Sequence, residues 1–475
     1  MILPKDFETY TRRLMGSERY NRLVQALQTE PHTFVRTNPL KAANFGLCQS
    51  GGTVEWYEEG HWLNSRPAFT FDPLLHAGLY YVQEKSSMFL AQVLRRHVSQ
   101  PVSMLDMCAA PGGKSTLARM VLPQGSLLMC NEPMRQRAQV LAENVQKCGV
   151  AETIVTNNYP EDYARSGLLF DVILCDVPCS GEGMFRKDAQ AIEEWSAANV
   201  DRCTKLQRDI VNSAWQCLQP GGLLVYSTCT FNTKENEENV EWLCNELGAQ
   251  PQEVGIREDW NICGSLLPGF DAPVYRFIPG FGDHNTDIQG EGLFMALLRK
   301  PGVKPADKPQ KKKEPRKTER PKSNWPASWL TDGENFCPVQ EGNRLLALPQ
   351  SMSRLYAEAA KKLRILHAGV CLGEVKGKDV VPDQSLALSV HLNADAFPAV
   401  EISYEEAIAF LRKEAVMLPA DTPRGFVLLT YKGLPLGFEK NLGNRANNLY
   451  PQEWRIKSSH LPETAPRIYE LNDTK

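Results

Sequence analysis

The middle of the chain alternates short, largely apolar runs with longer segments that carry apolar residues at helical spacing. The runs are continuous rather than alternating, which is typical of strands covered by helices on both faces. They are residues 102–107, 127–131, 153–156, 172–175, 223–227 and 293–298. This order predicts an α/β fold with an open, mostly parallel sheet of Rossmann type, in which ligands bind at the carboxyl ends of the strands.

The flanking parts of the chain have other patterns. Residues 1–33 predict two short amphipathic helices, and the glycine-rich stretch after them predicts short strands. Residues 352–366 predict a helix, and the apolar runs 425–431 and 434–438 around Lys432 and Gly433 predict a hairpin. The predicted division is an N-terminal α+β domain at 1–85, a Rossmann-like domain at 86–300, a basic, proline-rich linker at 301–323, a small intermediate domain at 324–368 and a β-rich domain at 369–475.

Composition excludes several classes of protein. A length of 475 residues is too great for one core, and the 42% hydrophobic and 23% charged residues are those of a globular protein. No apolar run approaches the ~20 residues of a membrane helix, and the N-terminus lacks a secretory segment, so we expect a cytoplasmic protein with no membrane contact. The 13 cysteines include no Cys-x-x-Cys pair, which argues against a disulfide framework or a zinc ribbon, and we expect no metal.

The net charge of the chain is −3, so the chain as a whole has no electrostatic attraction to nucleic acid. A basic footprint would have to be local. Basic residues mixed with Tyr450 and Trp454 near the C-terminus favour RNA contact, although a structural barrel with ordinary surface charge has the same composition. The charges of the 301–323 linker fit either phosphate contact or a solvated spacer.

A glycine-containing turn follows the first central strand and opens a helix. Its small residues allow a ligand to approach the backbone closely, and the helix N-terminus offers free N–H groups. Its spacing is neither that of a P-loop nor Gly-x-Gly-x-x-Gly. Glu132 ends the next strand, where a carboxylate can accept both ribose hydroxyls of a nucleoside cofactor, or serve simply as an acid favoured at a helix N-terminus. The combination predicts S-adenosyl-L-methionine as the cofactor.

Two cysteines stand at the ends of neighbouring buried strands. Cys179 closes Asp176-Val177-Pro178-Cys179, and Cys229 follows Thr228. Cytosine C5 becomes nucleophilic only after a thiolate adds at C6, so methylation there needs a cysteine. An ordinary thiol has a pKa of about 8.5, so the site must favour the thiolate or remove its proton. Asp176 is placed to bond N3 and the amino group of the ring. Either cysteine is a candidate nucleophile.

These residues resemble a known family. Residues 78–87, 108–114, 176–187, 226–230 and 235–237 match, in order, motifs of the bacterial RNA cytosine-5 methyltransferases. The segment 181–187 and the C-terminal part are most similar to the F subgroup of the small-subunit (16S) ribosomal RNA cytosine-5 methyltransferases. Residues 436–440 and 448–451 are similar to a PUA-like RNA-binding domain. The match covers roughly residues 34–300.

The resemblance implies a role for each site residue. Cys229 would attack C6, and Cys179 would assist release of the methylated product. Asn158 stands near the place where the family often has an acidic residue, and we expect it to bond the adenine amino group. The expected cofactor-binding residues are Cys108, Ala109, Ala110, Pro111, Gly112, Gly113, Lys114, Glu132, Asn158 and Asp176.

The expected function is methylation of cytosine C5 in 16S ribosomal RNA, through a covalent adduct between Cys229 and C6. The target base would have to leave its stack or lie in a loop. We expect a monomer that meets its RNA free or within the small subunit. Transfer RNA is an alternative substrate. A non-catalytic, RNA-binding assembly factor is a second alternative, against which intact Cys229, Cys179 and Asp176 argue.

Overall fold

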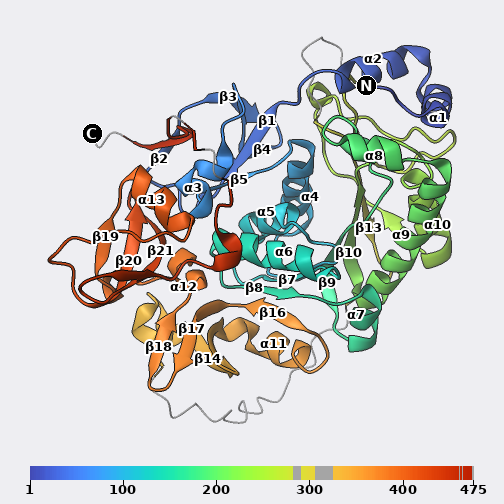
Figure 1. Cartoon of the computed structure of the whole chain (residues 1–475). Helices are drawn as coiled ribbons and strands as arrows, with labels where there is room; N and C mark the ends of the chain where they lie inside the picture. The colour runs from blue at the N-terminus through green and yellow to red at the C-terminus, as the bar shows by residue number, and fades with distance from the viewer. Residues whose placement is uncertain (282–289, 305–324, 459–460, 463, 473–475) are drawn as a thin grey trace.

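The computed structural model describes residues 1–281, 290–304, 325–458, 461–462 and 464–472. Within these residues the largest feature is a nine-stranded sheet (Figure 1). Five neighbouring strands are parallel and lie in the order β10-β9-β6-β7-β8. They are β6 (Ser103–Asp106), β7 (Leu127–Asn131), β8 (Thr153–Thr156), β9 (Phe170–Asp176) and β10 (Leu218–Thr228). The strand order reverses between β6 and β9, where open α/β sheets bind ligands, and the Rossmann-like fold class is confirmed.

Antiparallel strands extend both edges of this parallel core. At one edge β13 pairs with β10, and β11 and β12 pair with β13. At the other edge β16 pairs with β8. These strands are β11 (Gln250–Pro251), β12 (Tyr275–Phe277), β13 (Leu293–Arg299) and β16 (Ile365–Ala368). The strand β16 comes from the C-terminal part of the chain, so both halves of the sequence build the sheet.

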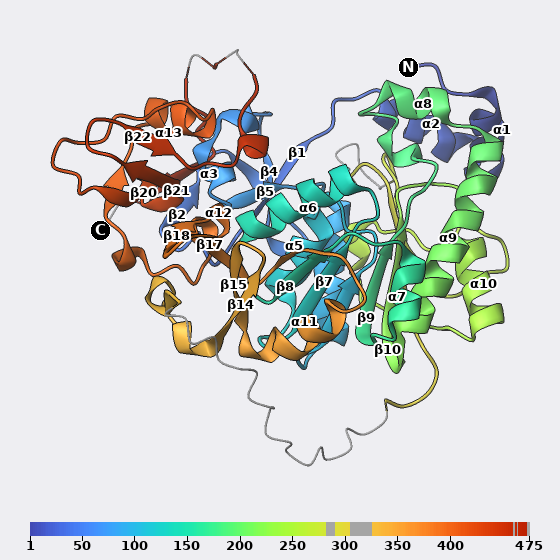
Figure 2. The same cartoon turned by 60° about the horizontal axis from the view of Figure 1, so that its bottom comes forward.

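Helices cover the two faces of the sheet and bury separate cores (Figure 2). Val172 and Leu174 of β9 lie in the core beneath α4, α5 and α6, whereas Ile173 and Cys175 lie in the core beneath α7, α9 and α10. This explains the continuous apolar runs, because both faces of each strand are buried. These covering helices are α4 (Phe89–His97), α5 (Gly113–Val121), α6 (Arg135–Cys148), α7 (Pro160–Ser166), α9 (Ala197–Cys217) and α10 (Glu237–Leu247). The short helix α8 (Ala189–Glu194) packs in the cluster formed with the two N-terminal helices instead.

The N-terminal residues divide into two packing units. The predicted helices are α1 (Lys5–Met15) and α2 (Ser17–Leu27), and they pack beside α8 (Figure 1). Phe7 of α1 contacts the rings of Phe185 and Trp195, close to the loop that follows β9. The second unit is a sheet in the order β3-β4-β1-β5. Its members are β1 (Thr33–Thr37), β3 (Ser50–Val54), β4 (Tyr57–Leu63) and β5 (Tyr80–Val82), with α3 (Pro73–His76) beside it.

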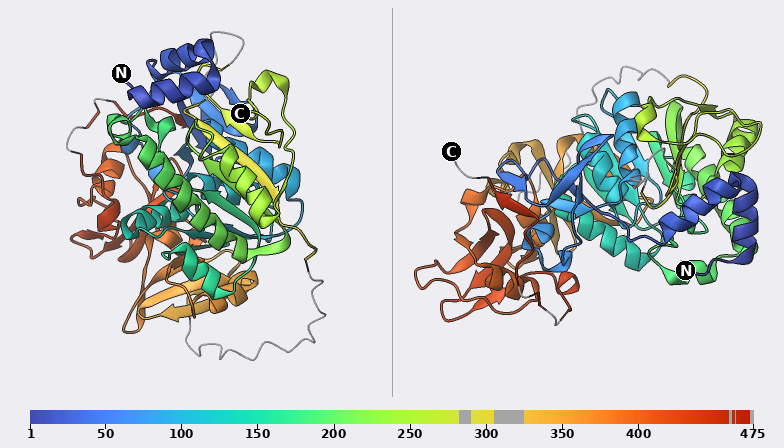
Figure 3. Two further views of the ribbon diagram at one scale, coloured as in Figure 1. Left: turned by 90° about the vertical axis from the view of Figure 1, so that its right-hand side faces the viewer. Right: turned by 90° about the horizontal axis from the view of Figure 1, so that it is seen from above.

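The C-terminal part contains two four-stranded sheets, β14-β15-β17-β18 and β19-β20-β21-β22, within the described residues. The second lies beside the N-terminal sheet and away from α9 and α10 (Figure 3). The predicted hairpin is confirmed as β20 and β21. The elements are β14 (Phe336–Glu341), β15 (Arg344–Pro349), α11 (Ser353–Ala359), β17 (Val370–Lys376), β18 (Asp379–Pro382), α12 (Gln384–Leu388), β19 (Ala399–Glu401), α13 (Tyr404–Leu411), β20 (Gly425–Tyr431), β21 (Leu434–Asn441) and β22 (Ala446–Asn448). The last strand, β23 (Tyr469–Leu471), pairs with β2 (Phe45–Leu47).

One element differs from the sequence-based expectation. The helix predicted at 352–366 ends at Ala359, and the chain turns into β16. As a strand, this segment forms backbone hydrogen bonds with the edge of β8, which would otherwise be open. This pairing outweighs the helical propensity of the local sequence. The expected boundary at 368/369 falls beside β17, inside a sheet that runs from β14 to β18. Of the expected linker at 301–323, residues 305–323 lie outside the described residues.

Candidate active site

The loops after β6, β9 and β10 meet at the carboxyl ends of these strands around a cleft of about 350 Å³. The β6 loop contains the expected cofactor turn. Gly112 immediately precedes α5 and has φ +113°, a conformation that favours glycine, and an added Cβ would lie 3.2 Å from Leu141. The cleft is lined by these predicted site residues: Cys108, Ala109, Ala110, Pro111, Gly113, Lys114, Asp176 and Cys229. Four of the five segments that match the family motifs therefore contribute residues to one site, and residues 235–237 are not part of its lining.

Asp176 is fixed from two sides at the end of β9. Its Oδ2 accepts a hydrogen bond from Lys114 Nζ at 2.8 Å, and its Oδ1 accepts one from Ser227 Oγ at 2.6 Å. Burial alone would lower the pKa of Lys114, but the Asp176 carboxylate outweighs burial and raises it. Lys114 therefore stays cationic inside the cleft, and it links the cofactor turn to the carboxylate at the strand end.

The two cysteines from neighbouring strand ends are in direct contact. Their Sγ atoms lie 3.1 Å apart, and the Cys229 backbone N–H points at the Cys179 sulfur, 3.4 Å away. The hydrogen bond with Cys229, followed by burial, raises the pKa of Cys179 well above its ordinary value. Cys179 therefore keeps its proton. Cys229 is the cysteine that lines the cleft, and the lining does not include Cys179.

Two buried carboxyl groups suit the predicted cofactor. Glu132 Oε1 accepts the Met134 backbone N–H, but its Oε2 is buried and makes no hydrogen bond, although Arg137 Nη1 lies 3.3 Å away. Asp106 Oδ2 accepts Ser115 Oγ–H, and its Oδ1 is buried without a hydrogen-bond partner. Burial raises the pKa of Asp106 to about 7. Ribose hydroxyls and an amino group are the donors that such oxygens lack, so the residues fit S-adenosyl-L-methionine.

Asn158 is placed differently from the other predicted cofactor residues. Its Oδ1 accepts the backbone N–H of Arg364 at 3.0 Å, and its Nδ2 donates to the Arg364 carbonyl at 3.2 Å. Asn158 thus anchors the chain segment that leads into β16. The lining of the cleft does not include it. Contact of Asn158 with adenine stays a prediction.

Sequence reasoning gave no role to the carboxylates that join the two cysteine loops. Glu182 Oε2 accepts the backbone N–H groups of Phe231 and Asn232, and its Oε1 accepts the indole N–H of Trp195. Gly183 N–H donates to the Cys229 carbonyl at 2.7 Å. Glu182 belongs to the 181–187 segment, which in the sequence is only a motif of the family. The motif gives the position of Glu182, but it does not show which groups the carboxylate binds.

A second buried carboxylate, Glu235, supports the same loops. It accepts hydrogen bonds from Ser180 N–H and from Gln207 Nε2. Burial, followed by the charge of Glu182, raises the pKa of Glu235 to about 7. Together Glu182 and Glu235 connect the loop after β9 to the loop after β10 and hold both cysteines in place.

The fold and this site define an S-adenosyl-L-methionine-dependent RNA methyltransferase. The family described as 16S rRNA methyltransferase RsmB/F matches residues 91–298. The N-terminal domain of 16S rRNA methyltransferase RsmF matches residues 3–85, and the methyltransferase RsmF PUA domain matches residues 397–456. The chain belongs to this family of ribosomal RNA small subunit methyltransferases F.

Relatives support this assignment, and two solved structures share the fold. Ribosomal RNA small subunit methyltransferase F of Klebsiella pneumoniae is 30% identical over 477 residues, which cover 95% of this chain and 96% of that protein. The protein of the same name from Citrobacter koseri is 32% identical, with the same coverage. NSun6 from Pyrococcus horikoshii, solved with SFG, has a TM-score of 0.51 at 21% identity and covers 63% of this chain and 99% of its own. A methyltransferase homolog from the same organism has a TM-score of 0.50 at 24% identity, with 63% and 100% covered.

The described part of the chain shows neither a metal-binding cluster nor a membrane-spanning helix. It holds no group of three or more His, Cys, Asp or Glu side chains that could bind a metal ion. Nor does any helix there have the length and apolar character needed to cross a bilayer.

Proposed function

We propose that this chain methylates C5 of a cytidine in 16S ribosomal RNA through a covalent bond between Cys229 Sγ and C6 of the base. The single observation that carries the proposal is the position of Cys229, which lines the cleft with the cofactor turn and contacts Cys179. A second cysteine at this place fits the chemistry, because an adduct that forms must also be broken.

The cofactor site uses residues from the strand ends. The turn from Cys108 to Lys114 would hold the amino-acid part, and Glu132 Oε2, which makes no hydrogen bond, would accept one from a ribose hydroxyl. Asp106 Oδ1 would accept the amino group. When bound, the cofactor supplies an electrophilic methyl group on a sulfonium.

The chain's own residues activate and orient the base. The Cys229 thiolate adds to C6, and the electron pair of the C5–C6 double bond becomes available at C5, which takes up the methyl group. The Asp176 carboxylate accepts a hydrogen bond from the amino group at the N3 edge of cytosine. Because Lys114 and Ser227 fix both carboxylate oxygens, Asp176 presents a fixed edge to the ring.

Product release needs loss of the C5 proton. When a base removes this proton, its electron pair re-forms the C5–C6 double bond and expels the Cys229 thiolate. Cys179 assists this step. Its raised pKa keeps a proton on its sulfur, 3.1 Å from the departing sulfur, and a hydrogen bond stabilises the thiolate as it forms.

The proposed function also includes the RNA substrate, the cellular location and the oligomeric state of the protein. The names of the relatives and the family support ribosomal RNA of the small subunit over transfer RNA. We propose a cytoplasmic monomer that acts on free 16S ribosomal RNA or on the small subunit. Intact Cys229, Cys179 and Asp176 support an enzyme over a non-catalytic assembly factor.

Bisulfite sequencing of total RNA from a strain that lacks the gene tests the substrate. We expect one 16S cytidine to lose its methyl group, and the chain to restore it when re-expressed. Cys229→Ala should fail to restore it. Loss of methylation only in transfer RNA would overturn the ribosomal assignment, and full restoration by Cys229→Ala would overturn the nucleophile.

A further inference from the structure

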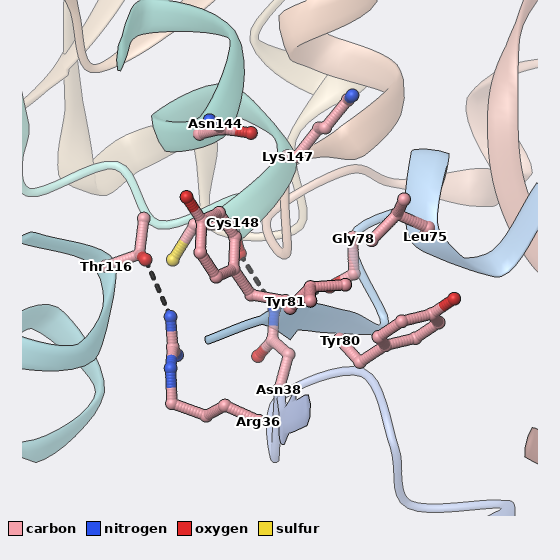
Figure 4. A pocket seen from close by; sticks show the side chains of 11 residues that line it. Arg36, Asn38, Leu75, Gly78, Tyr80, Tyr81, Thr116, Asn144, Lys147 and Cys148 are labelled. Carbon is pink, nitrogen blue, oxygen red and sulfur yellow. Dashed lines mark hydrogen bonds between the residues drawn. The ribbon is translucent and has the colours of Figure 1, made fainter. Parts of the chain in front are cut away.

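A second pocket lies between the N-terminal sheet and helices α5 and α6 (Figure 4). Its volume is about 220 Å³. It is lined mainly by polar and aromatic side chains: Arg36, Asn38, Tyr81, Thr116, Asn144 and Lys147. Tyr81 and Val82 also line the catalytic cleft, so one wall separates the two spaces. The methylation chemistry gives this pocket no role.

Arg36 brings a buried charge to this pocket. Its side chain comes from β1, is 2% exposed and points toward Thr116 (Figure 4). The acceptors that it reaches are neutral: Nε donates to Gln83 Oε1 at 2.8 Å, and Nη2 donates to Thr116 Oγ1 at 2.7 Å. No carboxylate of the described residues forms an ion pair with Arg36. A buried guanidinium keeps its charge, so an anion is the partner it lacks.

Other cations make the surroundings of the pocket positive. Burial raises the pKa of the Cys148 thiol in the pocket wall. The positive charges of Arg36 and Lys41 oppose that rise. Lys41 is also buried, and it donates to two backbone carbonyls rather than to a carboxylate. Lys147 lines the pocket and pairs with Glu143 at 2.6 Å.

We propose that this pocket is a nucleotide subsite, in which Arg36 binds a phosphate of the substrate RNA next to the target cytidine. Arg presents a fork of donors that matches phosphate oxygens. The Tyr81 ring lies 5.6 Å from the Arg36 guanidinium and offers a face on which a neighbouring base can stack. Because Tyr81 and Val82 line both spaces, the pocket lies next to the cleft, which favours a phosphate of the same RNA strand over a free anion. The subsite rests on the proposed RNA substrate.

The test compares Arg36→Met with Arg119→Met, a matched control. Arg119 is 8% exposed and donates from Nη1 to the Ser126 carbonyl, and it does not line the pocket. Filter binding measures the affinity for 16S ribosomal RNA from a deletion strain at several salt concentrations. S-adenosyl-L-methionine affinity, measured by calorimetry, reports whether each variant is folded.

We expect Arg36→Met to weaken RNA binding about tenfold or more and to lower the salt slope by about 0.7 for one lost phosphate contact. Lys147→Gln should weaken binding in the same direction. Arg119→Met should bind RNA like the wild type, and all variants should keep the cofactor affinity. If Arg36→Met fails to bind cofactor and is therefore misfolded, Lys147→Gln decides alone.

Several results would overturn the subsite. One is wild-type RNA affinity and salt slope in both Arg36→Met and Lys147→Gln. Another is equal weakening in Arg36→Met and Arg119→Met. Heat protection by inorganic phosphate that is lost in Arg36→Met, with RNA affinity unchanged, would indicate a free-anion site instead. A wild-type chain that neither binds nor methylates 16S ribosomal RNA would instead refute the proposed function itself.

Discussion

The sulfur atoms of Cys179 and Cys229 lie 3.1 Å apart, although the two residues stand 50 positions apart in the chain. The parallel pairing of β9 with β10 produces this contact, since Asp176 is opposite Ser227 at the ends of the two strands. The hydrogen bond between the sulfurs, followed by burial, raises the pKa of Cys179. One sulfur is therefore kept protonated while its neighbour faces the cleft.

The raised pKa of Cys179 predicts a trapped covalent intermediate in Cys179→Ala. Without the Cys179 proton beside it, the Cys229 thiolate should leave C6 slowly, so a covalent protein–RNA complex should accumulate. Denaturing gel electrophoresis with labelled 16S ribosomal RNA detects it as a slow band. The double variant Cys179→Ala/Cys229→Ala should give no such band. A Cys179→Ala protein that turns over at the wild-type rate without a band would refute the release role.

A second prediction concerns the carboxylate that joins the cysteine loops. In Glu182→Gln, an amide N–H group replaces one of the oxygens that accept hydrogen bonds. The variant should lose about 1–3 kcal/mol of the hydrogen bonding that connects residue 182 to the backbone of Phe231 and Asn232. We expect kcat to fall about tenfold or more, with cofactor affinity unchanged.

The control for this variant is Glu439→Gln. Glu439 is another fully buried glutamate, in β21, and its oxygens make no hydrogen bond. It should keep the wild-type kcat. Equal losses in both variants would show that any buried glutamate matters to folding, and that Glu182 has no special part in positioning Cys229.

The raised pKa of Asp106 predicts that the free energy of unfolding depends on pH. Burial raises its pKa from 3.8 to about 7, so the folded chain binds a proton that the unfolded chain has released. Stability contributed by this proton is present at acid pH and is lost as the pH rises from about 4 through about 7. Asp106→Asn should remove this loss, and the variant should unfold at higher urea than the wild type at pH 8 but not at pH 4. Equal pH profiles would contradict the assignment.

The same carboxyl group should make cofactor binding pH-dependent. If Asp106 accepts the amino group of S-adenosyl-L-methionine, its ionised form binds better, and the wild-type affinity should rise between pH 6 and 8. Calorimetry should show no such rise in Asp106→Asn, whose overall affinity should be lower. If the cofactor affinity of both proteins rose equally with pH, a group other than Asp106 would be responsible for the titration.

The ion pair of Arg276 and Glu237 predicts a large effect on folding. Both side chains are fully buried, and Arg276 Nε donates to Glu237 Oε1 at 2.6 Å. Glu237→Gln should cost about 3–5 kcal/mol of unfolding free energy, because it leaves a buried charge without its partner. The exposed pair of Arg95 and Glu58 is the comparison, and Glu58→Gln should cost less than about 1 kcal/mol. Urea unfolding measures both.

The sequence predicts well those features that depend on local patterns. The continuous apolar runs placed the parallel strands, and the turn from Cys108 to Lys114 lines the cleft. Polar residues just after buried strands marked Asp176 and Cys229, because the carboxyl ends of parallel strands meet at one edge.

Features that depend on distant pairing could not be predicted. Glu182 lies in a short segment, and its partners at Phe231 and Asn232 are set by how two loops fold together. Residues 360–366 continue a helical pattern, yet Ile365 pairs with Thr156 of β8. The side chain of Asn158 is taken up by the same segment, through Arg364.

The position of β16 has a consequence for how the protein is made. The strand pairs with β8 and completes the catalytic sheet, although it is synthesised after every other strand of that sheet. In a nascent chain that ends soon after β13, β8 is an exposed edge strand of the sheet. Other chains can pair with such an edge. The methyltransferase sheet is therefore finished only when β16 leaves the ribosome, and a chain cut short before Ile365 should aggregate rather than work as a smaller enzyme.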